Sequence, residues 1–132
     1  MREFKFRGKW SNGDGWVYGW YVGYSQSDGY IHGDYVDEDE VWLVEAETVG
    51  QYVGVPDKNN VDIYEGDIVK IVFPAYYGEE AKVEFFKIVF VNKDRLGGFF
   101  AQDADGETWI VENQEVEVVG NIYDNPELME VI

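Results

Sequence analysis

Apolar and polar residues alternate at every second position along most of this chain, and that pattern limits the possible folds more than any other feature. In "FKFRGK", residues 4–9, aromatic and basic residues alternate, so the two kinds would occupy opposite faces of a strand. Asn-Gly and Asp-Gly pairs, as in "SNGDG" at residues 11–15, favour the tight turns that join neighbouring strands. The sequence therefore predicts a mostly β protein built as a small barrel or as curled sheets.

A helical pattern is expected only near the C-terminus. "DNPELME", residues 124–130, offers capping residues, a proline at the first helical position and a glutamate near the positive end of the helix dipole. This pattern predicts a short C-terminal helix or helical turn. The composition changes near residues 46–50, which separates an aromatic-rich N-terminal β segment (residues 1–48) from a second β region (residues 49–132). Both regions could also form one compact domain.

The charge of the chain limits its partners. Ten Lys and Arg residues face twenty-seven Asp and Glu residues, for a net charge of -17. Nucleic-acid affinity depends on basic side chains that displace counterions from phosphates, so direct binding to DNA or RNA is disfavoured. Two exceptions stay open: a local basic patch, and a surface that mimics the charge of DNA and thereby occupies a DNA-binding protein.

Cysteine is absent from the sequence, which excludes disulfides, a thiolate nucleophile and a cysteine-based zinc site. The first ten residues, "MREFKFRGKW", lack the apolar core of a signal peptide, and no apolar run approaches the length of a transmembrane helix. We expect a soluble, cytoplasmic protein.

No group of residues has the spacing of a known catalytic or metal site. The acidic run at residues 37–40 lacks the alternating ligands, the central glycine and the distal glutamate of a calcium loop, so we interpret it as a solvated connector. His32 is the single histidine and has no nucleophile motif nearby. The glycine-rich stretches lack the lysine and the strand-to-helix context of a phosphate loop. We expect no catalytic residue, no metal and no cofactor.

The alternation of "WVYGWYVGY", residues 16–24, predicts a strand with one almost wholly aromatic face: Trp16, Tyr18, Trp20, Val22 and Tyr24. Packing in the core is the favoured interpretation, and a stacking platform for sugars or bases is the second. A third interpretation is an interface, because Trp and Tyr are enriched where proteins meet. The candidate interaction residues are the aromatic residues of this strand and the acidic run that follows it: Trp16, Tyr18, Trp20, Asp37, Glu38, Asp39 and Glu40.

Several short stretches occur in an order and spacing typical of one family. They are "KFRGK" (5–9), "WVYG" (16–19), "ETVGQYVG" (47–54), "DKN" (57–59), "IYEGDIV" (63–69) and "VVGNIYDNPEL" (118–128). Together they resemble the YopX family, small proteins encoded by bacteriophages and prophages of Gram-positive bacteria. The resemblance spans nearly the whole chain. It implies a mostly β fold with an SH3-like barrel, here over residues 49–132, phage origin, the cytoplasm of a bacterial host and no assigned activity.

Two turns in these stretches can be explained without catalysis. Asn60 stands where the family usually has glycine, and Asn tolerates the left-handed backbone nearly as well. In "YEGD" we expect Gly66 to adopt a positive φ and Asp67 to bond its own backbone two residues on.

The leading hypothesis is therefore a non-catalytic protein-interaction or self-assembling module whose partner is a protein or another copy of the chain. The alternative is an acidic DNA mimic that inhibits a host DNA-binding or restriction protein. A third hypothesis, an enzyme acting on a nucleotide or sugar, would require a deep pocket with converging carboxylates and rings.

Overall fold

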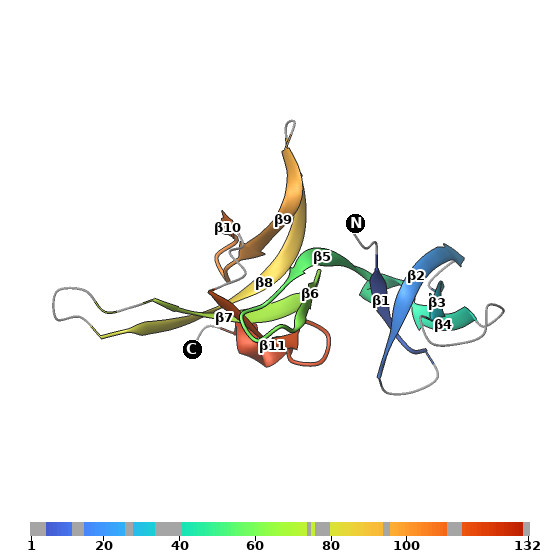
Figure 1. Ribbon diagram of the computed structural model, residues 1–132, viewed down its shortest axis with the longest axis horizontal. Coiled ribbons are helices and arrows are strands. Elements are labelled where there is room, and N and C mark those ends of the chain that lie inside the picture. Colours follow the sequence, from blue (N-terminus) through green and yellow to red (C-terminus); the bar gives the residue numbers. More distant parts are fainter. Residues whose placement is uncertain are drawn as a thin grey trace. The chain divides into compact units, whose positions relative to one another are not determined.

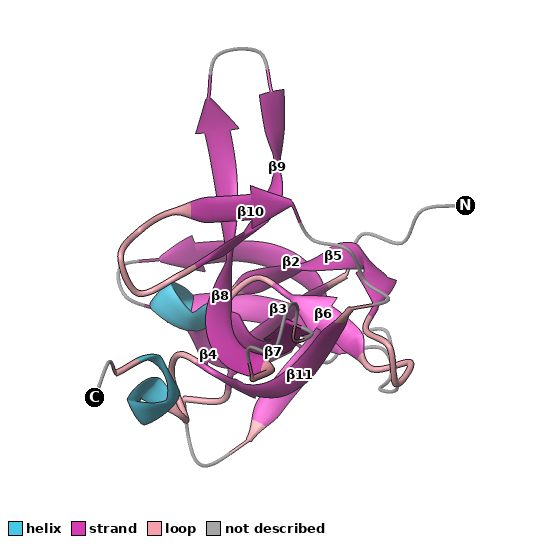
Figure 2. Ribbon diagram, turned by 90° about the vertical axis from the view of Figure 1, so that its left-hand side faces the viewer, coloured by secondary structure: helices cyan, strands magenta, loops and turns pink. Residues whose placement is uncertain are grey.

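The structure is a computed structural model that describes residues 5–11, 15–25, 28–33, 41–73, 75, 80–93, 96–110 and 115–130. Of residues 20–25, 28–33, 41–42, 91–93, 96–97 and 110 it describes the backbone alone. The chain divides into two compact units, Met1–Gly54 and Val55–Ile132. Strands dominate both (Figure 1, Figure 2). The prediction of a mostly β fold is confirmed.

The first unit contains the strands β4-β3-β2-β1-β5 of a six-stranded sheet, whose order ends with β6 of the second unit. Its elements are β1 (Phe6–Lys9), β2 (Trp16–Ser25), β3 (Asp28–Gly33), β4 (Val41–Glu45), the 3-10 turn η1 (Ala46–Thr48) and β5 (Gly50–Pro56), which crosses the unit boundary. The Thr48 side chain links the turn η1 to β1. Its hydroxyl donates to the Glu45 carbonyl at 2.6 Å and accepts the Lys9 N–H at 2.8 Å.

A bulge interrupts β2. Tyr21 pairs with Ile31 but Gly23 pairs with Tyr30, so Val22 is an extra residue on its strand. One extra residue reverses the alternation of a strand beyond it. The unbroken alternation predicted for residues 16–24 is therefore wrong past Tyr21.

The second unit contains a five-stranded antiparallel sheet with the order β10-β9-β8-β7-β11. Its elements are β6 (Asp62–Tyr64), β7 (Asp67–Phe73), β8 (Lys82–Lys93), β9 (Leu96–Gln102), β10 (Thr108–Ile110), β11 (Val116–Asn121) and the 3-10 turn η2 (Pro126–Met129). The expected C-terminal helix is thus a single 3-10 turn of four residues. The described strands close no barrel, so an SH3-like barrel stays a prediction.

The core of this second unit lies where β7 and β8 begin to pair. The adjacent residues Ile68 and Val69 point to opposite faces of β7, and both are completely buried. Phe86 pairs with Val69 and is 1% exposed. The apolar run "DIVKIVF" explains this, since a strand covered on both faces needs apolar residues at consecutive positions.

The long strand β8 belongs to two hairpins. Its residues 82–87 pair with β7, whereas residues 87–93 pair with β9. Figure 1 shows the two hairpins as separate arms, the β7–β8 arm at the left and the β8–β9 arm at the top. Within the described part of the chain, residues 82–86 consequently have a strand partner on one side only.

The "YEGD" turn joins these strands to β11. Gly66 has the positive φ that was predicted, 92°. Its N–H donates to the Ile88 carbonyl and its carbonyl accepts the Ile122 N–H, both at 2.9 Å. The Asp67 carboxylate accepts the N–H of Tyr64, three residues earlier, at 2.8 Å. The bond expected from Asp67 to backbone two residues on stays a prediction. Asn60 adopts the predicted left-handed backbone, with a φ of 65°.

Candidate interaction surface

Two of the predicted interaction residues have described side chains. Trp16 is half-buried, and the guanidinium carbon of the buried Arg7 lies 4.7 Å from the centre of its ring, a cation–π geometry. Tyr18 pairs with Arg7 across the strands and is 42% exposed, so its side chain is not part of the core. The backbone of Trp20 pairs with His32. The side chain of Trp20 and the whole acidic run at residues 37–40 lie outside the described residues.

The carboxylate of Asp57 has a structural task. One oxygen accepts the N–H groups of Asn59 at 2.8 Å and Val61 at 2.9 Å, and the other accepts the N–H of Val118 on β11 at 2.8 Å. Burial raises the pKa of Asp57, but these three hydrogen bonds and the nearby Lys58 charge together hold it below its usual value. This ionised group therefore ties the turn at residues 57–61 to β11.

The C-terminal motif is also accounted for by turns. The Asn121 side-chain carbonyl accepts the N–H groups of Tyr123 at 3.0 Å and Asp124 at 2.8 Å. A Cβ atom on Gly120 would lie 2.5 Å from the side-chain oxygen of Asn125, which leaves no room for a larger residue without movement.

Among the described residues, no three His, Cys, Asp or Glu side chains are grouped as metal ligands would be. No helix formed by the described residues is long and apolar enough to cross a membrane.

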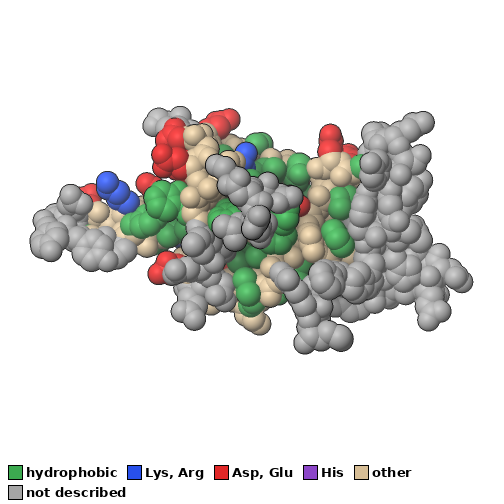
Figure 3. All heavy atoms as spheres, turned by 90° about the horizontal axis from the view of Figure 1, so that it is seen from above, with side chains coloured by type: hydrophobic (Ala, Val, Ile, Leu, Met, Phe, Trp, Pro, Cys, Tyr) green, Lys and Arg blue, Asp and Glu red, His purple; other side chains and the backbone are tan. Residues whose placement is uncertain are grey.

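The β7–β8 arm exposes apolar side chains. Val72 and Val83 lie directly opposite each other on the two strands and are 47% and 51% exposed. Phe73, the next residue on β7, is 40% exposed on the opposite face of the arm. We call Val72, Phe73 and Val83 the arm patch. Figure 3 shows hydrophobic side chains at the surface on this side of the molecule, at the left, with acidic side chains nearby.

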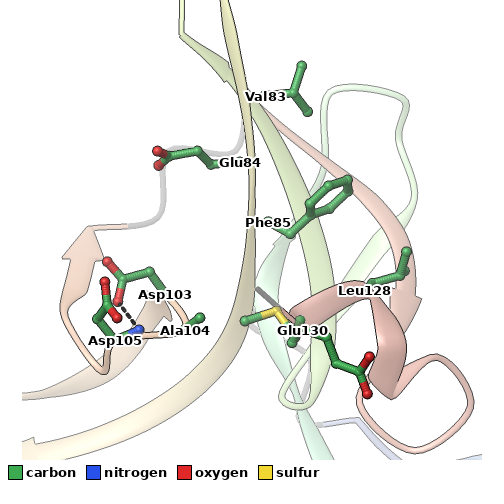
Figure 4. Close-up of a pocket in the computed structure, with 9 residues that line it drawn as sticks. Val83, Glu84, Phe85, Asp103, Ala104, Asp105, Leu128 and Glu130 are labelled. Carbon is green, nitrogen blue, oxygen red and sulfur yellow. Dashed lines mark hydrogen bonds between the residues drawn. The ribbon is translucent and has the colours of Figure 1, made fainter. Parts of the chain in front are cut away.

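A groove of about 270 Å³ begins at the arm patch and follows β8. Three segments line it: residues 83–85 of β8, the β9–β10 turn at residues 103–105, and residues 128–130 around the end of η2. Figure 4 shows Val83 and Phe85 on the side of β8 that faces Leu128, whereas Glu84 points to the other side, where Asp103 and Asp105 lie. One wall is therefore apolar and the other is acidic.

The candidate interaction residues named from the sequence include none of the residues of the arm patch or the groove. The sequence held one signal for the patch, because the apolar run of β7 continues through Val72 and Phe73. The described pairing of β11 with β7 ends at Ile71, so β11 does not pair with these two residues. That limit depends on which strand pairs with β7, which a local pattern does not reveal. The groove also requires three segments distant in sequence.

Comparisons with known proteins identify a family and a fold. The family model described as YopX protein matches residues 5–130. No curated protein matches the sequence significantly. Among solved structures, the crystal structure of protein EF1440 from Enterococcus faecalis is similar with a TM-score of 0.60 and 20% identity, covering 98% of this chain and 100% of that one. At this identity the likeness concerns the fold alone.

Proposed function

This chain belongs to the YopX family, and from that premise we propose that it is a non-catalytic module that binds another protein through the arm patch. The carrying observation is the cross-strand pair Val72 and Val83, two valines that are each about half exposed on one face of the arm, while Phe73 is exposed on the other. Exposed apolar side chains on a projecting hairpin are in unfavourable contact with water. A bound partner would bury them and remove that contact.

The buried carboxylates support a role without catalysis. Asp57 and Asp67 are 4% and 1% exposed, and both accept backbone N–H groups that hold turns in place. Catalytic acids and bases instead need to reach a substrate from a pocket. The resemblance to phage proteins supports action in the cytoplasm of a bacterial host and a second unit related to SH3-like barrels.

Photo-crosslinking tests this proposal with a matched control. A benzophenone amino acid in place of Val72 is expected to give a covalent product with one protein in the cells that naturally make this chain, because that position lies at the contact. The same substitution at Val61 is expected to give none, although Val61 is also 47% exposed, because it lies in the turn after Asp57. A product with twice the mass of the chain would identify self-assembly. Equal labelling at both positions, or none at position 72, would contradict the proposal.

Mimicry of DNA is the second candidate function, and the net charge of -17 favours it. In this case the partner is a host DNA-binding or restriction protein whose basic surface binds acidic side chains arranged like phosphates. Duplex DNA added before crosslinking is then expected to abolish the product at position 72. If excess DNA leaves the crosslink unchanged, DNA and this chain do not compete for one site on the partner. That result would eliminate mimicry.

A further inference from the structure

The edge of β8 that borders the groove has backbone groups available for pairing. The Ile88 carbonyl points to the side of β7, because it accepts the N–H of Gly66 there. Backbone groups alternate in direction along a strand, so those of Phe86 and Glu84 also point toward β7. Those of Val83 and Phe85 point the opposite way. The pairing with β9 begins only at Lys87, and no described residue bonds to these outward groups.

The two sides of this edge differ in chemistry. On the side of η2, the groove is lined by the apolar residues Val83, Phe85, Leu128 and Met129, with Glu130 beyond them. On the opposite side lie Glu84 and the two aspartates of the β9–β10 turn, Asp103 and Asp105. Among the described residues, no Lys or Arg lines the groove. A strand placed along this edge would present its alternate side chains to an apolar surface and to an acidic one.

We propose that an extended segment of a partner protein, with apolar residues alternating with Lys or Arg, pairs with residues 82–86 of β8 as an added strand. Its backbone bonds to the outward groups of Val83 and Phe85, which gives affinity, as in other cases of strand addition. Its apolar side chains pack toward Leu128, and its basic side chains face Glu84, Asp103 and Asp105. This inference rests on the proposed function and specifies the chemistry of the partner.

The probe is a fluorescent peptide, Lys-Val-Lys-Val-Lys-Val-Lys, tested with the full chain. It is expected to bind, whereas the same peptide with Glu in place of Lys is not, because the acidic wall repels it. Two further peptides carry backbone N-methyl groups on the valines or on the lysines. Only one of these two sets of N–H groups faces β8, so one methylated peptide loses binding and the other, with identical charge, keeps it. Equal binding of both would show attraction by charge alone and overturn the proposal.

Changes to the protein test the same contact. Val83→Pro removes an N–H that the β7–β8 ladder does not use, and proline is tolerated where a strand edge faces solvent. It is expected to raise the Kd for the peptide at least about tenfold, whereas Val83→Ala, which keeps the N–H and loses only part of the apolar contact, raises it less. Glu84→Gln also weakens binding. Glu115→Gln, an exposed acid outside the groove, is the control for net charge.

Amide hydrogen exchange of the full chain shows where the peptide binds. The N–H groups of Val83 and Phe85 exchange quickly in the free protein and become protected in the complex, whereas those of Glu84 and Phe86 are protected in both. A peptide that does not bind at millimolar concentration, or that binds without protecting Val83 and Phe85, overturns strand addition. A crosslink at Val72 would in that case still support an interaction module, so the two proposals can fail separately.

Discussion

Replacing Asp57 with alanine is expected to lower the free energy of unfolding by about 3 to 4 kcal/mol, measured by urea denaturation at neutral pH. The Asp57 side chain is 4% exposed and accepts three backbone N–H groups, from Asn59, Val61 and Val118. Alanine would leave these donors without their acceptor where water has little access. Asp57→Asn is expected to cost less, because its amide oxygen can still accept two of the bonds.

Asp103 is a matched control, since it forms the same kind of turn in a more exposed place. Its carboxylate accepts the N–H groups of Asp105 at 3.0 Å and Glu107 at 2.9 Å, two and four residues ahead, as Asp57 does within its own turn. Among the described residues, Asp103 bonds to no distant strand, and water can replace the lost acceptor. Asp103→Ala is expected to cost about 1 kcal/mol. Equal losses for the two alanine variants would contradict the role given to burial and to Val118.

The contribution of Asp57 should also depend on pH. Because its pKa is lowered in the folded state, despite the opposing effect of burial, the ionised carboxylate stabilises the fold at any pH above its unfolded pKa, near 4. That stabilisation is lost as the pH falls through the lower, folded pKa. The difference in unfolding free energy between the wild type and Asp57→Asn is therefore constant at neutral pH and shrinks below about pH 4. Taking the difference cancels the many other acids, and a gap that instead widens in acid would contradict the shift.

The second large effect is expected for Phe86→Ala, with a loss of about 3 to 5 kcal/mol in unfolding free energy. Phe86 is 1% exposed and pairs with the fully buried Val69, so alanine would leave a cavity between elements that cannot collapse freely. Chemical denaturation at equilibrium measures the loss.

Phe90 provides the control on the same strand. It is 50% exposed and forms an edge-to-face contact with Phe99, with ring centres 5.3 Å apart. Phe90→Ala should cost only about 1 kcal/mol, the value of one exposed aromatic pair. If Phe90→Ala cost as much as Phe86→Ala, the core would extend along β8 into the β8–β9 arm.

Local patterns in the sequence predicted the β class and the strained turns. Alternation depends on the side-chain period of a single strand, and the positive φ of Gly66 and Asn60 depends on residue type, so both can be predicted without knowing what packs against them. The apolar run of β7 likewise indicates burial on both faces.

Features that depend on partner strands could not be predicted in this way. The bulge at Val22 exists because of how β2 pairs with β3, and the hydrogen bond of Asp67 depends on where Tyr64 turns. The C-terminal pattern indicated a helix or helical turn, and the 3-10 turn η2 forms there. The groove could not be predicted before this pairing was known, because among the described strands β8 lacks a second partner only where β9 does not reach it.

The bond between Asp57 and Val118 joins residues 61 positions apart in the chain. Lys58 also donates to the Val116 carbonyl at 3.1 Å, and β7 pairs with β11. During synthesis, the turn at residues 57–61 and the edge of β7 therefore stay without these bonds until β11 has been made. Contacts of such long range close slowly and leave strand edges exposed in the meantime. Completion of the turn at residues 57–61 thus depends on β11, a strand made much later in synthesis.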